Sequence, residues 1–404
     1  QSNTNYSVSM KVRYTYRCYP TPRQERSLAR VFGACRYVYN KALHIRTDAW
    51  QTEQRKVTYF DTSAMTAVWK RTDESWLQSV SSVPVQQSLR HLQTAFINFW
   101  NKTTMYPAFK RKHAKQSAEY TVSAFKYNSD TRQLKISGIG VIDVRWSRGF
   151  KSKPTTVTIT KRPSGKYFVT LCLDEVVKPV AKTGKAVGID LGVSRLATLS
   201  TGERVANPKY LAKNLAKLQQ EQRRLSRKTK GSNRYANQKK RVARVHEYVA
   251  NCRKDYLAKL TTRLVKEFDV IKIEDLNVRG MIANHCLARA VSDVGIYAFR
   301  QMLTYKAVWY GKDLQLVDRF FPSSKRCHCC GYVSQKLPLA VREWVCPECQ
   351  APHDRDENAA INILFAEGHS VKARGVTVRR LRSSGPKCKS LRNANLPCAA
   401  TALA

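Results

Sequence analysis

Acidic residues are scarce in this sequence. Its 404 residues include 29 Asp and Glu against 72 Lys and Arg, which leaves a formal net charge of +43 at pH 7. The basic excess is spread along the chain rather than held in one tail. A field of this sign and size favours a polyanionic partner. Nucleic acid is therefore the first partner to expect, and a ribosomal or chromatin-type protein is the alternative that charge alone leaves open.

Long apolar runs are also missing. The sequence has no stretch of about 18 consecutive apolar residues, which a membrane-spanning helix would need. The first residues are polar, so we expect no signal peptide, no membrane partner and a cytoplasmic protein. Residues 1–9 precede the first methionine, Met10, and we treat them as a cloning remnant or a disordered segment.

The cysteines lack the pattern of a disulfide framework. Of the 12 cysteines, four form two Cys-x-x-Cys pairs about fifteen residues apart, and the others are scattered. Four thiolates at this spacing indicate a closed tetrahedral zinc site with a structural role, one Zn²⁺ per chain. The predicted ligands are Cys327, Cys330, Cys346 and Cys349. Cys329 is a spare thiol beside them, so the choice of Cys330 rests on spacing.

Three acidic positions stand out among the few carboxylates. Asp190 follows the buried-strand pattern of KAVGI, and Glu274 follows that of DVIKI. Asp354 and Asp356 both lie at the start of a helical pattern. A single acid at such a place is commonly a cap, but capping accounts for only one of the last two.

Acids from distant parts of a chain can meet at the carboxyl edge of one sheet. Three carboxylates gathered there would repel one another unless cations lay between them. Mg²⁺ prefers a few carboxylates together with waters and phosphate oxygens. Two such ions can activate a water and stabilise the leaving oxygen of a phosphodiester. The acids and the basic charge together predict a two-ion Mg²⁺ site that hydrolyses nucleic acid.

The sequence pattern of the first half of the chain predicts strands interrupted by helices. Alternation over 10–19 predicts a strand, and strand patterns from about 120 to 174 predict the rest of a small β-barrel. Helical periodicity over about 23–46, 62–77 and 84–100 predicts three helices inserted into that barrel.

Several polar side chains are candidates for nucleic-acid contact. Gln86 and Arg90 share a face that could read base edges, although a solvated helix face is the more common explanation. Lys110 belongs to a basic stretch interleaved with aromatic residues, which suits phosphate contact and stacking. Lys126 is a further candidate. A basic run joins two long helical patterns at about 212–227 and 234–268, and its members Arg227, Lys228 and Lys230 are expected to lie against a nucleic-acid backbone.

Taken together, these motifs resemble the TnpB proteins encoded by bacterial and archaeal insertion sequences. The resemblance rests on GIDLGVSRLATLS, RRLSRKTKGSNR, IEDLNVRGM, SSKRCHCCGY and CPECQAPHDRDENAAINI, in that order. It implies a multidomain α/β and β-barrel protein whose RuvC-type, RNase H-like nuclease contains a zinc-ribbon-like insert. The implied parts are a wedge barrel (10–22 and 106–180), a helical recognition lobe (23–105), the nuclease (181–320 and 353–370), a zinc-binding insert that contacts target nucleic acid (321–352) and a disordered or RNA-associated tail (371–404).

The resemblance also implies an activity. TnpB-like proteins are RNA-guided DNA endonucleases of prokaryotic cells whose guide RNA derives from the transposon end. They cut double-stranded DNA next to a short target-adjacent motif, and we expect one protein per guide. By the family motif, Asp190, Glu274 and Asp356 correspond to the three RuvC acids, with Asp354 as the second choice for the last.

The sequence is also compatible with other functions. A compact CRISPR effector using a CRISPR guide would look nearly the same. A nuclease-inactive, RNA-guided repressor would have lost acids that this chain keeps. A strand-transfer transposase would share the three acids but would leave the barrel and the recognition helices unexplained. The tail after about residue 370, with Cys388 and Cys398, has no clear core pattern.

Overall fold

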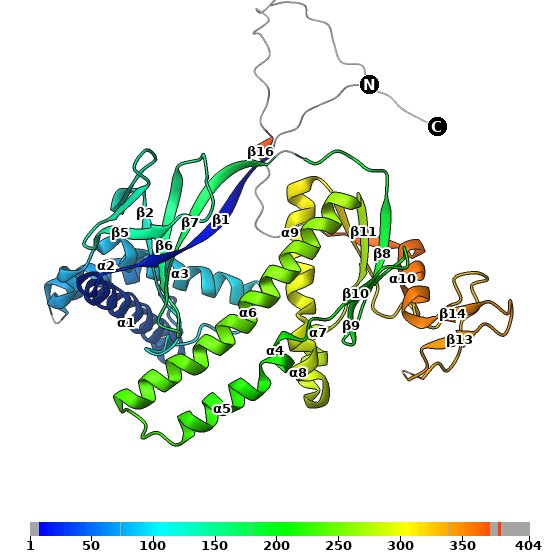
Figure 1. Ribbon diagram of the computed structural model, residues 1–404. Coiled ribbons are helices and arrows are strands. Elements are labelled where there is room, and N and C mark those ends of the chain that lie inside the picture. Colours follow the sequence, from blue (N-terminus) through cyan, green and yellow to red (C-terminus); the bar gives the residue numbers. More distant parts are fainter. Residues whose placement is uncertain (1–7, 73, 178, 339, 372–378, 381–404) are drawn as a thin grey trace, which may run out of the picture.

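The computed structural model describes residues 8–371 except positions 73, 178 and 339, together with 379–380. Two sheets lie at opposite sides of the molecule, and the long helix α6 (Asn233–Glu267) runs between them (Figure 1). The expected tail of 371–404, including Cys388 and Cys398, lies almost wholly outside the described residues. Among the residues described, no helix is long and apolar enough to cross a membrane.

The first sheet is antiparallel and nearly closed. Its strand order is β2-β6-β7-β1-β5-β4-β3, and a short strand β16 also pairs with β1. Apolar residues that alternate along the strands fill its interior, among them Tyr16, Leu134, Ile159 and Leu171. The barrel-like sheet predicted from the alternating pattern is therefore present. Its strands are β1 (Val8–Tyr19), β2 (Gln116–Thr121), β3 (Phe125–Asn128), β4 (Gln133–Ile136), β5 (Gly140–Arg145), β6 (Pro154–Lys161), β7 (Tyr167–Val177) and β16 (Arg379–Arg380).

The predicted helices lie between β1 and β2 in the chain. They are α1 (Pro22–Glu53), α2 (Tyr59–Arg71) and α3 (Ser82–Trp100). Thr21 caps α1 in a capping box with Gln24, and a proline occupies the first turn. The expectation of one helix over 62–77 was wrong at its end, because α2 stops at Arg71 and a separate 3₁₀ turn follows at Ser75–Ser79.

The second sheet is mixed and has the order β10-β9-β8-β11-β12-β15. Strands β8, β11 and β12 run parallel, whereas β9, β10 and β15 are antiparallel to their neighbours. Val187, Gly188 and Ile189 of β8 are all buried, which suits a strand covered on both faces, whereas the residues of β11 alternate between buried and partly buried. The strands are β8 (Ala186–Leu191), β9 (Arg195–Leu199), β10 (Arg204–Ala206), β11 (Val270–Glu274), β12 (Asp313–Val317) and β15 (Gly368–Ser370).

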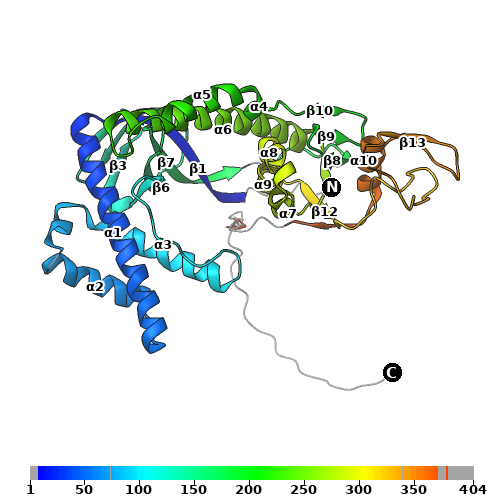
Figure 2. The same ribbon diagram turned by 90° about the horizontal axis from the view of Figure 1, so that it is seen from below.

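Helices cover this sheet and connect it to the first one. After the short α4 (Tyr210–Lys213), α5 (Leu215–Ser226) and α6 run side by side, as Figures 1 and 2 both show. Glu247 of α6 pairs with Arg162 at 2.8 Å and with Lys166 at 3.2 Å, which fastens the β6–β7 hairpin to the helix. The remaining helices are α7 (Val278–Ala283), α8 (His285–Val294), α9 (Ile296–Tyr310) and α10 (Arg355–Phe365).

Sequence periodicity missed α7 and α8. Val294 ends α8, and α9 begins two residues later. Gly295 separates them with a φ of +78°, a left-handed conformation that glycine adopts without steric cost. The chain therefore turns between two short helices rather than continuing through one.

Candidate active site and metal centre

Two of the three candidate acids come from adjacent strands. Asp190 lies in β8, and Glu274 is the last residue of β11. The two strands are parallel, with Ile189 paired to Ile273, so their carboxyl ends meet at one edge of the sheet. Asp356 reaches the same place from the first turn of α10. All three line one cleft of about 1030 Å³.

A close approach of backbone to backbone brings α10 to this edge. A β-carbon at Gly188, two residues before Asp190, would lie 2.1 Å from the carbonyl oxygen of Ala360 and 2.5 Å from the amide nitrogen of Leu364. Only glycine allows α10 to pack so tightly on β8. The glycine of the GID string thus has a packing reason that the sequence alone did not reveal.

The acids affect one another electrostatically. Burial, together with the negative charges of Glu274 and Asp356, raises the pKa of Asp190 to about 7 against an opposing contribution from Arg355. Burial also raises the pKa of Glu274, opposed by the hydroxyl of Ser323, which donates to Oε1. A site that disfavours its own negative charge in this way is suited to a divalent cation, which would relieve the repulsion.

Two further acids, Asp275 and Asp354, lie close to the candidate acids in sequence but make structural contacts instead. Asp275, next to Glu274, pairs with Arg300 and Arg319. Asp354 caps α10, because its Oδ1 accepts the backbone N–H groups of Asp356 and Glu357 at 3.0 Å each. The other oxygen of Asp354 accepts from Arg204 at 2.9 Å. Asp354 does not line the cleft, whereas Asp356 does.

Basic side chains that sequence reasoning did not single out also line the cleft. Arg342 reaches in from the cysteine-rich insert and pairs with Asp356 Oδ1 at 3.1 Å. Lys209 and Arg289 lie on the wall formed by α4 and α8. No local motif marks these residues, because they reach the cleft only through tertiary packing.

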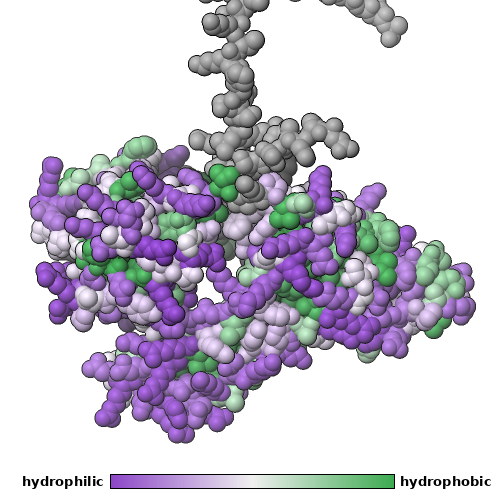
Figure 3. Space-filling view, turned by 45° about the horizontal axis from the view of Figure 1, so that its top comes forward, coloured by the Kyte–Doolittle hydropathy of each residue, from purple (hydrophilic) through white to green (hydrophobic). Residues whose placement is uncertain are grey.

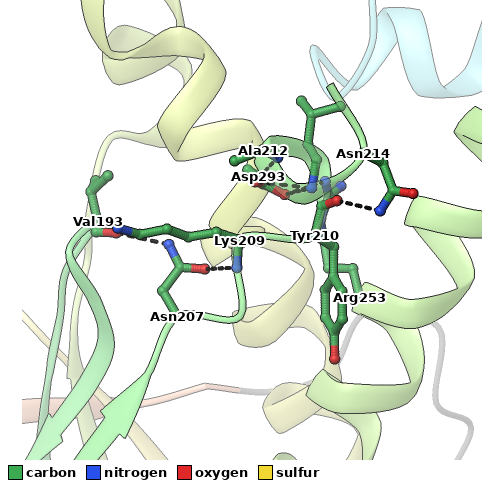
Figure 4. Close-up of polar contacts among 9 residues, drawn as sticks. Val193, Asn207, Lys209, Tyr210, Ala212, Asn214, Arg253 and Asp293 are labelled. Carbon is green, nitrogen blue, oxygen red and sulfur yellow. Dashed lines mark hydrogen bonds and ion pairs between the residues drawn. The ribbon is translucent and has the colours of Figure 1, made fainter. Parts of the chain in front are cut away.

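A network of hydrogen bonds and one ion pair fixes the start of α4, the part of the cleft wall that carries Lys209 (Figure 4). Asp293 of α8 is buried and accepts the backbone N–H groups of Leu211 and Ala212 at 2.9 and 3.2 Å. Arg253 of α6 donates to the same carboxylate at 3.1 Å. The start of α4 is thereby fixed to two helices.

The loop before α4 is tied down as well (Figure 4). Asn207 donates to the carbonyl of Val193 at 2.8 Å, and its side-chain oxygen accepts the N–H of Lys209 at 3.1 Å. Lys209 itself has a φ of +50°, which is unusual for a residue with a β-carbon. An exposed lysine is therefore held in a strained conformation at the cleft.

The four predicted cysteines form a cluster. Their sulfur atoms all lie within 4.8 Å of one another, with Cys327 and Cys349 at 3.6 Å and Cys330 and Cys346 at 3.6 Å. This arrangement could hold one metal ion, and four thiolates fit zinc. Cys329 is not part of the four; its sulfur lies 3.4 Å from His328 Nε2 and forms a second possible metal-holding group with Cys327 and His353.

His353 lies beside the cluster. Its Nε2 is 3.0 Å from the sulfur of Cys327. Burial opposes ionisation of this thiol, but backbone N–H groups of the knuckle and His353 lower the pKa of Cys327 to about 5. Sequence spacing gave no sign of this histidine, which lies on the short strand β14 (Pro352–Asp354) paired with β13 (Glu343–Val345).

The candidate nucleic-acid contacts lie away from the cleft. Gln86 and Arg90 are exposed on α3, and Lys126 is exposed on β3. Lys110 lies with its ammonium 3.9 Å from the centre of the Tyr39 ring. The exposed residues Arg227, Lys228 and Lys230 lie between α5 and α6. None of the seven lines the cleft that holds the acids.

Three protein-family descriptions match this chain. Residues 168–285 match OrfB_IS605, described as "Probable transposase", and residues 297–363 match the Cas12f1-like TNB domain. Residues 10–55 match the "Helix-turn-helix domain" of the same OrfB group. In this chain those residues form strand β1 and the single long helix α1.

Curated relatives cover nearly the whole chain. A Streptomyces pristinaespiralis protein named "Putative RNA-guided DNA endonuclease" is 49% identical over 380 residues, which is 93% of this chain and 94% of that protein. This chain belongs to the TnpB, or OrfB_IS605, family. The InsQ protein of Escherichia coli strain K12, another member with the same kind of name, is 33% identical over 383 residues and covers 91% of this chain and 94% of InsQ.

The TnpB fold also matches a solved structure. A chain in the cryo-EM structure of the Cas12f1-sgRNA-target DNA complex aligns with a TM-score of 0.56 at 13% identity. The alignment covers 86% of this chain and 84% of that chain. The mixed α/β, multidomain architecture of this TnpB protein is therefore of the Cas12f kind.

Proposed function

We propose that this TnpB protein is an RNA-guided DNA endonuclease that hydrolyses phosphodiester bonds of target DNA with divalent cations. The observation that carries the proposal is the meeting of Asp190, Glu274 and Asp356 in one cleft, where the pKa of Asp190 is raised to about 7. The names of its relatives and the RNA and DNA in the Cas12f1 structure support the same assignment.

The donor set fits Mg²⁺, which takes oxygen ligands and keeps open positions for water and phosphate. Bound between these carboxylates, Mg²⁺ would polarise the phosphate and favour a nucleophilic water. The residues of the chain supply the rest. Ser323 orients Glu274, the cap at Asp354 holds the helix that carries Asp356, and Lys209 with Arg289 adds positive charge for the DNA strand.

For the cysteine cluster we propose one structural Zn²⁺. A closed set of four thiolates leaves no open position, so such an ion would stabilise an insert that has little core of its own. We assign residues 321–352 to contact with target nucleic acid, which the match to the TNB domain supports. One zinc per chain, lost on replacing Cys327 and Cys346, is the result that metal analysis should give.

We further propose roles for the other parts. The first sheet would be the wedge and α1–α3 the recognition lobe, which would hold the guide–target duplex and read the adjacent motif with residues such as Gln86, Arg90 and Lys126. The exposed run at Arg227–Lys230 would lie along the guide RNA. The face of the molecule drawn in Figure 3 is mostly hydrophilic with small separate apolar patches, which suits a large nucleic-acid partner.

The guide would come from the transposon end, and one protein would act per guide in the prokaryotic cytoplasm. The test is to purify the protein with co-expressed RNA, sequence that RNA, and offer matched and mismatched DNA with Mg²⁺. Cleavage should require a match and should vanish in Asp190→Ala. Cutting without a guide, or cutting that survives Asp190→Ala, contradicts the proposal. A guide derived from a CRISPR array would instead identify a CRISPR effector. If the protein joined DNA strands rather than cutting them, it would be a transposase.

A further inference from the structure

A chain of hydrogen bonds joins the first cysteine knuckle to Glu274. Ser323 is the link at the active site, because its hydroxyl donates to Glu274 Oε1 and its carbonyl accepts from Asn362 Nδ2 at 2.8 Å. The same amide of Asn362 donates to the carbonyl of Arg326 at 2.6 Å. Arg326 directly precedes Cys327. One side chain of α10 therefore connects the segment that orients Glu274 to the first ligand of the cysteine cluster.

A second amide of α10 holds the other side of the knuckle. Asn358 donates to the carbonyl of Arg326 at 2.7 Å, and its oxygen accepts the backbone N–H of His328 at 3.1 Å. Arg326 and His328 flank Cys327, so the backbone on both sides of the ligand is fastened to the helix. Both amides are buried, Asn358 at 1% exposure and Asn362 at 5%.

Separating the knuckle from the helix would leave these amides and carbonyls buried without partners. Leaving a buried polar group without a hydrogen-bond partner destabilises the protein, so the two elements should move together. The first turn of α10 carries Asp356, and Arg342 of the insert pairs with it. Two of the three candidate carboxylates are thus attached to the cysteine-rich insert, one through Ser323 and one through α10.

We infer that the metal-bound cysteine cluster positions the cation-binding acids, with Ser323, Asn358 and Asn362 as the positioning residues. This inference rests on the proposed function. Filling the cluster would stiffen the knuckle, hold Ser323 against Glu274 and fix the start of α10. By linkage, any gain in divalent-cation affinity on filling the cluster must be matched by an equal gain in affinity of the cluster for its own metal. If the cluster served only to fold its insert, its metal would not affect the carboxylates.

The test measures Mn²⁺ affinity, with Mn²⁺ as an EPR-visible substitute for Mg²⁺, on the full chain with its co-purified RNA. Ser323→Ala should weaken Mn²⁺ binding about 10-fold, the scale on which outer-shell changes act, while leaving zinc content unchanged. Ser323→Thr keeps the hydroxyl and should therefore keep the Mn²⁺ affinity of the parent protein. The matched control is Ser334→Ala, since this partly exposed serine of the same insert donates to the carbonyl of Lys336 and does not line the cleft.

A double-mutant cycle then tests the coupling itself. Emptying the cluster with Cys349→Ser should weaken Mn²⁺ binding in the parent protein and have a smaller further effect in Ser323→Ala. Cys329→Ser, outside the four-sulfur set, should change neither metal. If Cys349→Ser proves unfolded, Asn362→Ala breaks the link with zinc still bound and should give the same loss.

The outcomes separate the two claims. Mn²⁺ binding that does not depend on Asp190 contradicts the proposed function itself. Binding that Asp190→Asn abolishes, but that is indifferent to the state of the cluster or to Asn362→Ala, overturns only the coupling. Strictly additive effects of Ser323→Ala and Cys349→Ser overturn it as well.

Discussion

The carbonyl oxygen of Ala360 lies so close to Gly188 that a β-carbon on residue 188 would be 2.1 Å from it. This contact sets the distance between β8 and α10. It therefore also sets where Asp356, one turn before Ala360, stands relative to Asp190, two residues after Gly188. The geometry of the proposed metal site depends on the absence of a single methyl group.

The first prediction follows from this contact. Gly188→Ala forces α10 away from β8, because the atoms in the way are backbone rather than a flexible side chain. We expect a loss of unfolding free energy of about 1–3 kcal/mol and a large loss of cleavage. The control is Gly33→Ala in α1, where nothing lies within 4 Å of the added carbon and stability should rise by about 0.5–1 kcal/mol. Thermal unfolding and a cleavage assay measure both, and an active, stable Gly188→Ala protein would contradict the argument.

The second prediction distinguishes the two acids at the start of α10. Asp356→Asn should lower guide-dependent cleavage by about 100-fold or more, because it removes a charge from the cleft. Asp354→Asn should keep most activity, since asparagine caps helices as well as aspartate does and only the pairing with Arg204 is lost. Single-turnover rates on matched DNA are the measurement. The reverse order of effects would make Asp354 the third acid.

The third prediction concerns Lys209. Lys209→Gly suits the left-handed backbone at φ +50°, so it should remove a strain on the order of 1 kcal/mol and not lower the unfolding midpoint. It should nevertheless weaken DNA binding and reduce the slope of log Kd against log salt by about 1, because one phosphate contact is lost. Lys209→Arg is the control and should keep the slope. Unchanged DNA affinity in Lys209→Gly would show that the lysine does not contact the strand.

The fourth prediction tests the basic run between α5 and α6. Neutralising Arg227, Lys228 and Lys230 together should weaken binding of the guide RNA and lower the salt slope by about 2–3. A charge-conserving triple variant, Arg227→Lys with Lys228→Arg and Lys230→Arg, separates charge from shape and should bind normally. Filter binding over a range of salt concentrations gives both slopes, and equal slopes would exclude this surface from RNA contact.

The parts that sequence predicted well depend on local pattern. The short apolar runs that lead into Asp190 and Glu274 predicted buried strands, and spacing predicted the four cysteines that cluster in the structure. The insertion of helices after the strand ending at Tyr19 was also readable from periodicity.

What sequence could not predict depends on side chains that meet across long separations. Asp293 binds backbone groups 82 and 81 positions earlier in the chain, and no local feature distinguishes it from a surface acid. Which of Asp354 and Asp356 caps α10 and which lines the cleft depends on the side-chain conformations, because the carboxylate of Asp354 turns back to the start of the helix. The same limit explains why Arg342 and Lys209 were missed, since only the assembled cleft brings them near the acids.

The last prediction concerns a buried lysine that the proposed activity does not use. Lys306 of α9 is 5% exposed and donates to the carbonyl of Ala258 at 2.6 Å and to Thr261 and Thr262 at 2.8 Å each, all on α6. Burial lowers its pKa from 10.5 to about 8. Between these values the unfolded chain holds the proton and the folded chain releases it, so raising the pH favours the folded state.

The unfolding free energy of the parent protein should therefore gain about 1–3 kcal/mol from this one group as the pH rises from 8 to 10.5. Other groups titrate over the same range, so the measurable quantity is the difference in slope between the parent and Lys306→Met, followed by denaturant unfolding at several pH values. Lys254→Met, which removes an exposed lysine of α6, is the matched control and should preserve the parent slope. Because Lys306→Met also removes the hydrogen bonds to Ala258, Thr261 and Thr262, it should be less stable at every pH. If the unfolding free energies of the parent and Lys306→Met changed with pH in parallel, Lys306 would keep its proton in the folded protein, held by its three acceptors.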